Sequence, residues 1–183
     1  MKKTRRILLT LVIFLLALSG CNKEAGDLPK KVKIGTIRVP NDKTVAIEEN
    51  FFDEFFKEKG IETEFIFFDS GTSVNQAFSS GALDFAEMGF TNGVVALANN
   101  LDVELIWIHE ILGTNEALIA NDDKGISSIE DLKGKKISTP FSSTSHLSLL
   151  KALEEEGLEE KDVELLDMDT ADIVAAWERG DLD

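Results

Sequence analysis

The sequence is short of cysteine, histidine and basic residues, and each shortage excludes a class of protein. Among 183 residues there are one cysteine, two histidines and three prolines. A single cysteine excludes a disulfide framework and a cysteine-based zinc cluster. The 19 basic residues stand against 34 acidic ones, for a net charge of −15, and no basic patch suited to binding nucleic acid is present. Because 43% of the residues are hydrophobic, we expect an acidic globular protein.

Motifs for catalysis and metal binding are also missing. His109 and His146 are the only histidines, and Ser145, next to His146, is the only candidate for a catalytic serine beside its base. Adjacent residues at a helix start point in different directions, and there is no Gly-x-Ser-x-Gly elbow. We interpret His146 as a donor or surface residue in the first turn of a helix, and His109 as a hydrogen-bonded core residue in an apolar strand. The sequence also has no metal-ligand spacing and no phosphate loop, so it predicts a non-enzyme without cofactor or metal.

The first twenty residues have the pattern of a secretory signal. A basic start, Met1–Arg6, is followed by the apolar run Ile7–Leu18, which at about twelve residues is too short to span a bilayer as a helix. Leu18-Ser19-Gly20-Cys21 resembles the lipobox of bacterial lipoproteins. That resemblance implies cleavage before Cys21 and a diacylglycerol on its sulfur, which is enough for stable anchoring. A plain signal peptide with an incidental cysteine is the alternative.

Removing this signal changes the charge and leaves the folded part without cysteine. The segment 1–20 carries four basic residues and no acidic ones, so 34 acidic residues then face 15 basic ones and the net charge becomes −19. Residues 21–30 are polar, contain Gly26 and Pro29, and predict a lipidated tether. We therefore expect an exported lipoprotein, anchored on the outer face of the cell membrane or on its periplasmic side.

The rest of the chain alternates short apolar runs with amphipathic segments, which predicts an α/β fold with a largely parallel sheet. Helix starts are marked by Ser, Thr, Asp or Asn, and several helix ends by Gly. The predicted strands are Val32–Ile37, Glu62–Phe68, Leu83–Met88, Val103–Ile111, Ala117–Ala120, Lys135–Thr139 and Val163–Leu166. The predicted helices are Asp42–Lys59, Val74–Ser79, Thr91–Ala98, Ser145–Glu156 and Thr170–Glu178, with a helical turn over Ser128–Leu132.

An internal repetition predicts two lobes of similar topology. In the first copy, a strand is followed by a helix that Gly81 stops and by a second strand that begins with Leu83-Asp84. In the second copy, a strand is followed by a helix that Gly180 stops and by Leu182-Asp183. Recurrence of ordinary helix–glycine–strand junctions is the alternative. We predict a first lobe over 31–118 and the start of a second lobe over 119–183, and we expect that second lobe to be incomplete because the sequence stops where its next strand begins.

Three polar loops lie where a predicted strand meets a helix: Asp69–Ser73, Gly89–Asn92 and Phe141–His146. In open α/β sheets, ligands bind at the carboxyl ends of the strands, and the N–H groups at helix starts bind anions. Each loop alone is explained by helix capping. Three of them in one exported chain favour a cleft that binds a small anion between two lobes.

Particular stretches resemble the solute-binding proteins of bacterial ABC importers in the nitrate, sulfonate and taurine group, and within it the taurine-binding proteins. The resemblance extends from about residue 31 to the last residue, and its most specific part is the run from Thr139 to His146. The matching stretches are Phe68-Asp69-Ser70-Gly71, Asn115-Glu116-Ala117-Leu118, Thr139-Pro140-Phe141-Ser142-Ser143-Thr144-Ser145-His146, Ser148-Leu149-Leu150-Lys151-Ala152-Leu153 and Ala175-Ala176-Trp177-Glu178-Arg179-Gly180-Asp181-Leu182-Asp183.

The resemblance implies a two-lobed, periplasmic-binding-protein-like (type II) fold that closes on one molecule of taurine or a similar small sulfonate and delivers it to an ABC permease. The sulfonate would lie near the start of the Ser145–Glu156 helix, facing the first lobe. The ammonium would meet Glu116 or Asp69, and Phe141 or Trp107 would offer an aromatic face. The full set of expected ligand-binding residues is Asp69, Ser70, Gly71, Thr91, Glu116, Phe141, Ser143, Thr144, Ser145 and His146.

Other interpretations stay open on the sequence alone. The ligand of such a binding protein is alternatively another alkanesulfonate, nitrate or a thiamine-precursor pyrimidine. An enzyme resembling the thiamine-pyrimidine synthases, which share this fold, is a second class, although an export signal speaks against that intracellular chemistry. A lipoprotein that binds no ligand, because its second lobe is incomplete, is a third.

Overall fold

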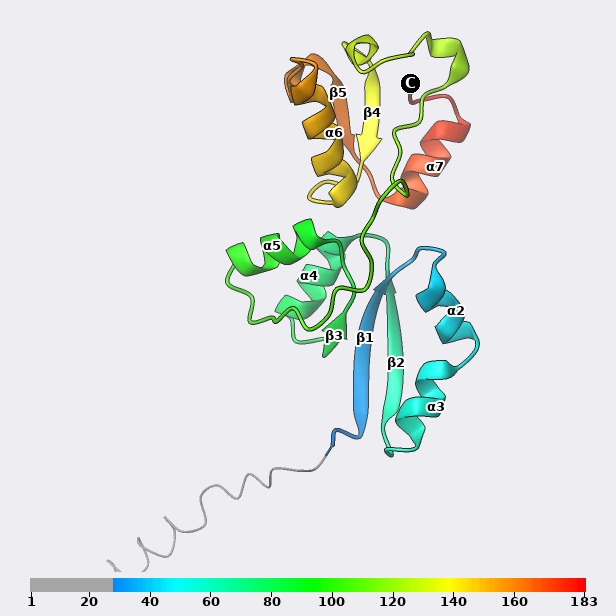
Figure 1. The fold of residues 1–183 in the computed structure, drawn as a ribbon, viewed down its shortest axis with the longest axis vertical. Coiled ribbons are helices and arrows are strands. Elements are labelled where there is room, and N and C mark those ends of the chain that lie inside the picture. Colours follow the sequence, from blue (N-terminus) through cyan, green and yellow to red (C-terminus); the bar gives the residue numbers. More distant parts are fainter. Residues whose placement is uncertain (1–27) are drawn as a thin grey trace, which may run out of the picture.

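The computed structural model describes residues 28–183, which form two parallel sheets with their own helices (Figure 1). The predicted signal, the lipobox and Cys21 lie outside the described residues. The two sheets agree with the predicted two-lobed α/β organisation. The boundary between residues 118 and 119 stays a prediction. Within residues 28–183, none of the helices is both long and apolar enough to cross a membrane.

The first sheet has three strands in the order β2-β1-β3, and all pairs are parallel. Its central strand β1, Lys31–Ile37, pairs along its whole length with β2, Glu62–Phe68. The third strand β3 is only Phe85–Ala86, shorter than the predicted Leu83–Met88, and pairs with Ile34 and Gly35 of β1. All three strands therefore end at the same edge of the sheet, and the polar loops that follow them are brought together there.

Four helices belong to the first sheet, with α2 and α3 along one side and α4 and α5 along the other (Figure 1). The single helix predicted over residues 42–59 is wrong, because Asn50 adopts a left-handed backbone with φ of 61° and divides it. Asparagine tolerates this conformation better than most residues. The helices are α2, Asp42–Glu48; α3, Phe51–Lys57; α4, Gly71–Ser79; and α5, Phe90–Ala98.

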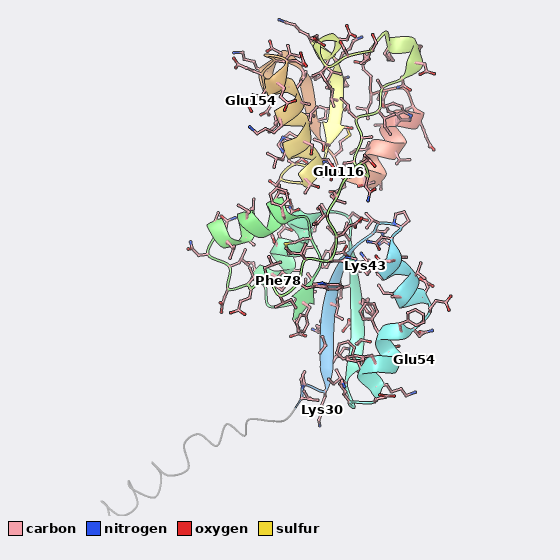
Figure 2. All side chains as sticks on the ribbon, viewed as in Figure 1. Lys30, Lys43, Glu54, Phe78, Glu116 and Glu154 are labelled. Atoms are coloured by element: carbon pink, nitrogen blue, oxygen red, sulfur yellow. The ribbon has the colours of Figure 1, made fainter. Side chains whose placement is uncertain are left out.

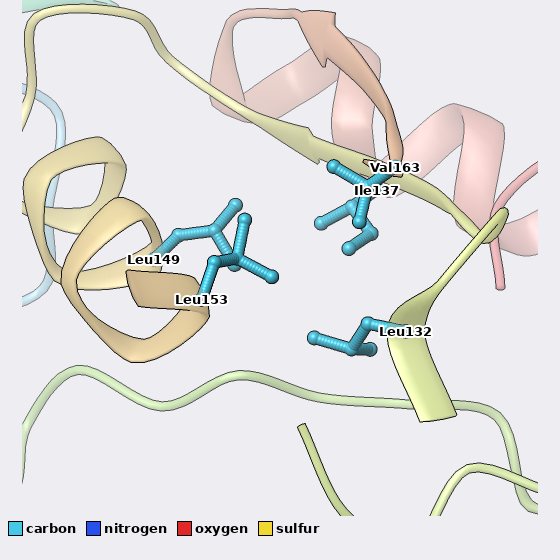
Figure 3. Packing of buried hydrophobic residues seen from close by; sticks show 5 residues of the cluster. All are labelled: Leu132, Ile137, Leu149, Leu153 and Val163. Carbon is cyan, nitrogen blue, oxygen red and sulfur yellow. The ribbon is translucent and has the colours of Figure 1, made fainter. Parts of the chain in front are cut away.

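The second sheet consists of β4, Lys136–Thr139, and β5, Glu164–Asp167, in parallel. Its helices α6, Thr144–Glu155, and α7, Thr170–Glu178, begin close to the predicted starts. Short 3-10 turns cover 122–124, 130–132 and 160–162. Leucines of α6 pack against aliphatic side chains of the sheet and its flanking turns to form the core of this unit (Figure 3), which consists of Leu132, Ile137, Leu149, Leu153 and Val163.

The predicted repetition is present in detail, because an aspartate makes the same pair of hydrogen bonds to the first strand in each sheet. The Asp84 N–H donates to the Lys33 carbonyl at 3.0 Å, and its carboxylate accepts from the Lys33 N–H at 2.8 Å. The Asp183 N–H donates to the Lys136 carbonyl at 3.0 Å, and its carboxylate accepts from the Lys136 N–H at 2.8 Å. In each copy the preceding leucine is buried. Each Leu-Asp junction therefore fixes the returning chain to the first strand of its own sheet.

The segment between the two units differs from the prediction. Residues 103–111 and 117–120, expected as strands, form no regular element. Their apolar side chains are largely exposed, with Leu105 at 82%, Trp107 at 72% and Ile111 at 88%. A strand needs a neighbour to accept its backbone hydrogen bonds, and none pairs with this segment within residues 28–183. The apolar alternation predicted a strand without predicting its partner.

The aspartate tie in the second unit predicts a pH-dependent stability. The Lys136 N–H and the Lys124 ammonium lower the pKa of the Asp183 carboxyl below its ordinary value. A carboxyl with a lowered folded pKa stabilises the folded state above its ordinary pKa, and this stabilisation is lost as pH falls through the lowered value. We expect Asp183→Asn to lower the thermal midpoint at pH 7, and the difference from the native protein to disappear as pH falls below about 4.

The measurement is thermal unfolding by circular dichroism across that pH range on the intact protein. Asp181→Asn is the matched control, since Asp181 is exposed and pairs only with Arg179 in the described chain. A midpoint difference for Asp183→Asn that stays constant from neutral to acid pH would show that its carboxylate does not contribute in this way.

Candidate functional site

The predicted loops lie at the starts of helices α4, α5 and α6, immediately after strands β2, β3 and β4 respectively. Ser70 caps α4 with its side chain, accepting from the Ser73 N–H at 3.4 Å. Asp69, just before it, is exposed and pairs with Arg38 at 3.2 Å. The capping explanation of this loop is therefore correct for the Ser70 hydroxyl. The N–H groups of Gly71 and Thr72 donate no hydrogen bond within residues 28–183, as is usual in a first helical turn.

The start of α6 is a tightly bonded turn. Ser143 caps the helix, because its hydroxyl accepts from the His146 N–H at 3.1 Å and donates to the Pro140 carbonyl at 2.6 Å. The His146 ring stacks on Phe141, with centroids 4.4 Å apart and planes 5° from parallel. Its Nδ1 accepts from the Ser142 N–H at 3.2 Å, which leaves Nε2 to carry the proton of the neutral ring. That Nε2 is buried and has no partner in the described chain, so it is a free donor.

The two units meet at these loops. A Cβ placed on Gly89, the residue before α5, would lie 3.2 Å from the Thr144 methyl group and 3.7 Å from the Thr91 hydroxyl. The Thr91 hydroxyl is buried and makes no hydrogen bond within residues 28–183. The close approach of Gly89 to Thr144 brings the predicted residues of α5 and α6 together, although they belong to different sheets.

Glu116 connects the segment between the units to α6, and Figure 2 shows it on that segment. Its carboxylate accepts hydrogen bonds from the hydroxyls of Thr144, Ser145 and Ser148, the last two at 3.3 and 3.4 Å. The predicted residues Glu116, Thr144 and Ser145 are thus in direct contact. The carboxylate lies against the helix start, where the N-terminal end of the helix dipole favours negative charge.

Two predicted aromatic or titratable groups lie elsewhere. Trp107 is 72% exposed on the irregular segment. The prediction of a core histidine in a strand is wrong for His109, because its segment forms no strand and its side chain is 23% exposed. Its expected hydrogen bond is present, since Nε2 lies 3.2 Å from the Asp42 carboxylate. Its half-buried position follows from the unpaired segment around it.

The structure adds two contacts that the sequence did not predict. Asn92 of α5 is only 3% exposed, and its amide occupies the space where a Cβ on Gly71 would lie. At the end of β1, the Lys43 ammonium pairs with Glu87 and donates to the Ile37 carbonyl at 2.9 Å. The sequence predicts neither contact, because the Gly71–Asn92 and Lys43–Glu87 pairs each join residues more than twenty positions apart.

The arrangement therefore gathers neutral donors at one place. Each of the helices α4, α5 and α6 presents first-turn N–H groups, and the hydroxyls and imidazole described above lie beside them. Such groups bind an anion without a basic side chain. Within residues 28–183, no three histidine, cysteine or acidic side chains are grouped to hold a metal ion.

Comparison with known proteins places these observations in a family. The NMT1/THI5-like family matches residues 45–183. A taurine-binding periplasmic protein of Escherichia coli (strain K12) is 40% identical over 129 residues, which are 70% of this chain and 40% of that protein.

Solved structures show the same fold. The alkanesulfonate-binding protein SsuA from Xanthomonas axonopodis pv. citri, bound to MOPS, aligns with 86% of this chain and 54% of its own, with a TM-score of 0.77 and 23% identity. The periplasmic aliphatic sulphonate binding protein SsuA from Escherichia coli gives a TM-score of 0.63 at 22% identity, over 85% of this chain and 53% of its own. This chain thus spans about half the length of each structure, or less than half of the taurine-binding relative. The expected α/β periplasmic-binding-protein fold is confirmed, and the chain belongs to the NMT1/THI5-like family.

Proposed function

We propose that this protein is an extracytoplasmic solute-binding protein that captures taurine, or a similar small sulfonate, and delivers it to an ABC permease. The observation that carries the proposal is the meeting of α4, α5 and α6 at their N-terminal ends, with Gly89 of one unit against Thr144 of the other. Similarity to a taurine-binding protein and to the SsuA fold supports the ligand class. The lipobox at Cys21 supports anchoring to the outer face of the membrane.

A sulfonate suits these donors because its charge is spread over three oxygens, each of which accepts hydrogen bonds. First-turn N–H groups and hydroxyls bind such oxygens through charge-assisted bonds. The predicted sulfonate contacts are Ser70, Gly71, Thr91, Ser143, Thr144, Ser145 and His146.

Glu116 is the group that favours an amino sulfonate over a simple anion. Its carboxylate already lies beside the hydroxyls of Thr144 and Ser145, so an incoming anion without a positive charge would be repelled by it. The ammonium of taurine would instead neutralise it. Asp69 is the second candidate, although its pairing with Arg38 makes it less available. Phe141, stacked on His146, supplies an aromatic face near the same place.

Capture requires no chemistry on the ligand. Groups from both units contact one molecule, and closure of the units on it would bury the ligand before docking to the permease. Transport energy would come from a separate ATP-hydrolysing subunit, since the sequence has no phosphate loop. The experiment that tests the ligand class is a thermal-shift panel on the intact protein with taurine, ethanesulfonate, nitrate and an aminopyrimidine. Stabilisation by another ligand with none by taurine would overturn the choice of taurine.

Removing the two hydroxyls at the start of α6 tests where the sulfonate binds. We expect Thr144→Ala combined with Ser145→Ala to weaken taurine binding more than tenfold. Each hydroxyl, which donates to Glu116 in this structure, would turn its one hydrogen to the sulfonate, and charge-assisted hydrogen bonds contribute about 1.5–3 kcal/mol each. Isothermal titration calorimetry on the intact protein measures the change. Ser79→Ala with Ser80→Ala, at the far end of α4, is the control and should leave affinity unchanged. An unaltered dissociation constant in the α6 variant would show that the sulfonate lies elsewhere.

Glu116→Gln separates recognition of the ammonium from recognition of the sulfonate. The variant keeps the size and hydrogen-bonding capacity of the side chain and loses only its charge. We expect taurine binding to weaken by about tenfold or more, while ethanesulfonate, which has no ammonium, binds at least as well as before. Glu110→Gln serves as the control, because Glu110 is exposed and bonds only to Asn115 in the described chain. Equal losses for both ligands would mean that Glu116 does not meet the ammonium.

A further inference from the structure

The turn before α6, residues 140–143, is held by side chains from two different elements. The Phe141 N–H donates to the Asp167 carboxylate at 2.9 Å, and the Ser142 N–H donates to His146 Nδ1 at 3.2 Å. Asp167 is the last residue of β5, whereas His146 lies on α6 itself. The neighbouring strand and the following helix therefore both fix the backbone of this turn.

Ser142 is the residue of the turn that most needs such support. It adopts a left-handed backbone with φ of 64°, a conformation that a residue with a Cβ adopts only at a cost in energy. The bond from its N–H to His146 holds it there, and the His146 ring is held in turn by its stacking on Phe141. The conformation of the whole turn thus depends on where Phe141 lies.

Asp167 determines the position of Phe141. Its side chain is exposed, and its carboxylate bonds within residues 28–183 to the Phe141 N–H alone. The first unit has a corresponding pair, because Asp69, which follows β2, bonds to Arg38, which follows β1, at 3.2 Å. In each unit, an aspartate at the end of the second strand holds the chain beyond the first strand. In the second unit the partner is a backbone N–H, for which any hydrogen-bond acceptor of the same shape suffices.

The turn leads directly into the first turn of α6, where the free donors lie. The N–H groups of Thr144 and Ser145 donate no hydrogen bond within residues 28–183. The next N–H group, that of His146, is already bonded to the Ser143 hydroxyl at 3.1 Å. First-turn N–H groups point out of the helix along its axis, so the preceding turn decides where the two free donors point.

Resting on the proposed function, we propose that Asp167 is a positioning residue of this site: by accepting from the Phe141 N–H, it holds the turn that directs the Thr144 and Ser145 N–H groups at the sulfonate. Asp167 acts through Phe141 and does not touch the ligand. Its negative charge opposes the binding of an anion, and only its capacity to accept a hydrogen bond is useful. The positioning role and the charge therefore predict opposite effects when the side chain is removed.

Calorimetry with taurine and ethanesulfonate on the intact protein separates these two effects. Asp167→Ala loses both the acceptor and the charge, and should weaken both ligands about three- to tenfold. Asp167→Asn loses only the charge, and should bind both ligands at least as tightly as the wild-type protein. Glu164→Ala is the control, because it removes the same charge from the exposed start of β5, where Glu164 pairs with Lys136 at 3.6 Å, and it should leave both affinities unchanged.

Two results would overturn this inference and leave the proposed function standing. The first is an Asp167→Ala variant that binds as tightly as the wild-type protein or more tightly, which would mean that the residue acts through its charge. The second is an equal loss in Asp167→Asn and Asp167→Ala, since the asparagine oxygen accepts the same hydrogen bond. Circular dichroism at the temperature of the titrations shows whether each variant is folded.

The proton on the His146 ring gives a second readout, which needs no ligand. Because the Ser142 N–H occupies Nδ1, the proton of the neutral ring must be on Nε2. NMR correlation of ring protons with ring nitrogens at pH 8, in the intact ligand-free protein, reports which nitrogen carries it. We expect the Nε2–H form in the wild-type protein and in Asp167→Asn, and a larger share of the Nδ1–H form in Asp167→Ala. His109, the other histidine of the sequence, is the internal reference.

The same spectra distinguish a failure of this inference from a failure of the proposed function. A wild-type ring protonated on Nδ1, or an Asp167→Ala spectrum identical to the wild-type one, would show that Asp167 does not hold the turn. Failure of the wild-type protein to bind taurine, ethanesulfonate or inorganic sulfate would instead overturn the proposed function, and the positioning role with it, whatever the spectra show.

Discussion

Parallel pairing of the strands is the constraint on which the rest of this structure depends. Because β1 pairs in parallel with both β2 and β3, the three strands end at one edge, and each helix that follows must begin there. The aspartates that follow the two leucine junctions hold this arrangement, since each bonds twice to the backbone of the first strand of its own sheet. The same tie in both units gives both sheets the same connection between helix and returning strand.

For the proposed binding of an anion, this arrangement means that no positively charged side chain is needed, because the helix starts supply hydrogen-bond donors. Each helix start carries roughly half a positive charge from aligned peptide dipoles, together with N–H groups that have no partner in the helix. Three such starts around one anion offer a favourable field in a protein whose net charge is −15. The capping hydroxyls of Ser70 and Ser143 fix the direction of those N–H groups. Capping and the proposed ligand binding would therefore be complementary uses of one loop.

The sequence was sufficient for elements whose boundaries are set locally. Serine caps, glycine stops and apolar runs predicted β1, β2, α4, α6 and α7 to within a few residues, and the Leu-Asp repetition predicted two similar units. It failed where the outcome depends on a distant neighbour. The run from 103 to 111 has the alternation of a strand and no partner in the described chain, and Asn50 breaks a helix that its amphipathic pattern favours. The loop that contains Asn92 was predicted, but the packing of its amide against Gly71, a residue on another helix, was not.

The contacts between the two units described above lie at the candidate site itself. Glu116 reaches α6 from the connecting segment, and Gly89 approaches Thr144. A ligand shifts a conformational equilibrium only by the difference in its affinity for the two states. A molecule that bonds to α4 and α5 on one unit and α6 on the other has that difference built in, because only the closed arrangement offers all the donors at once.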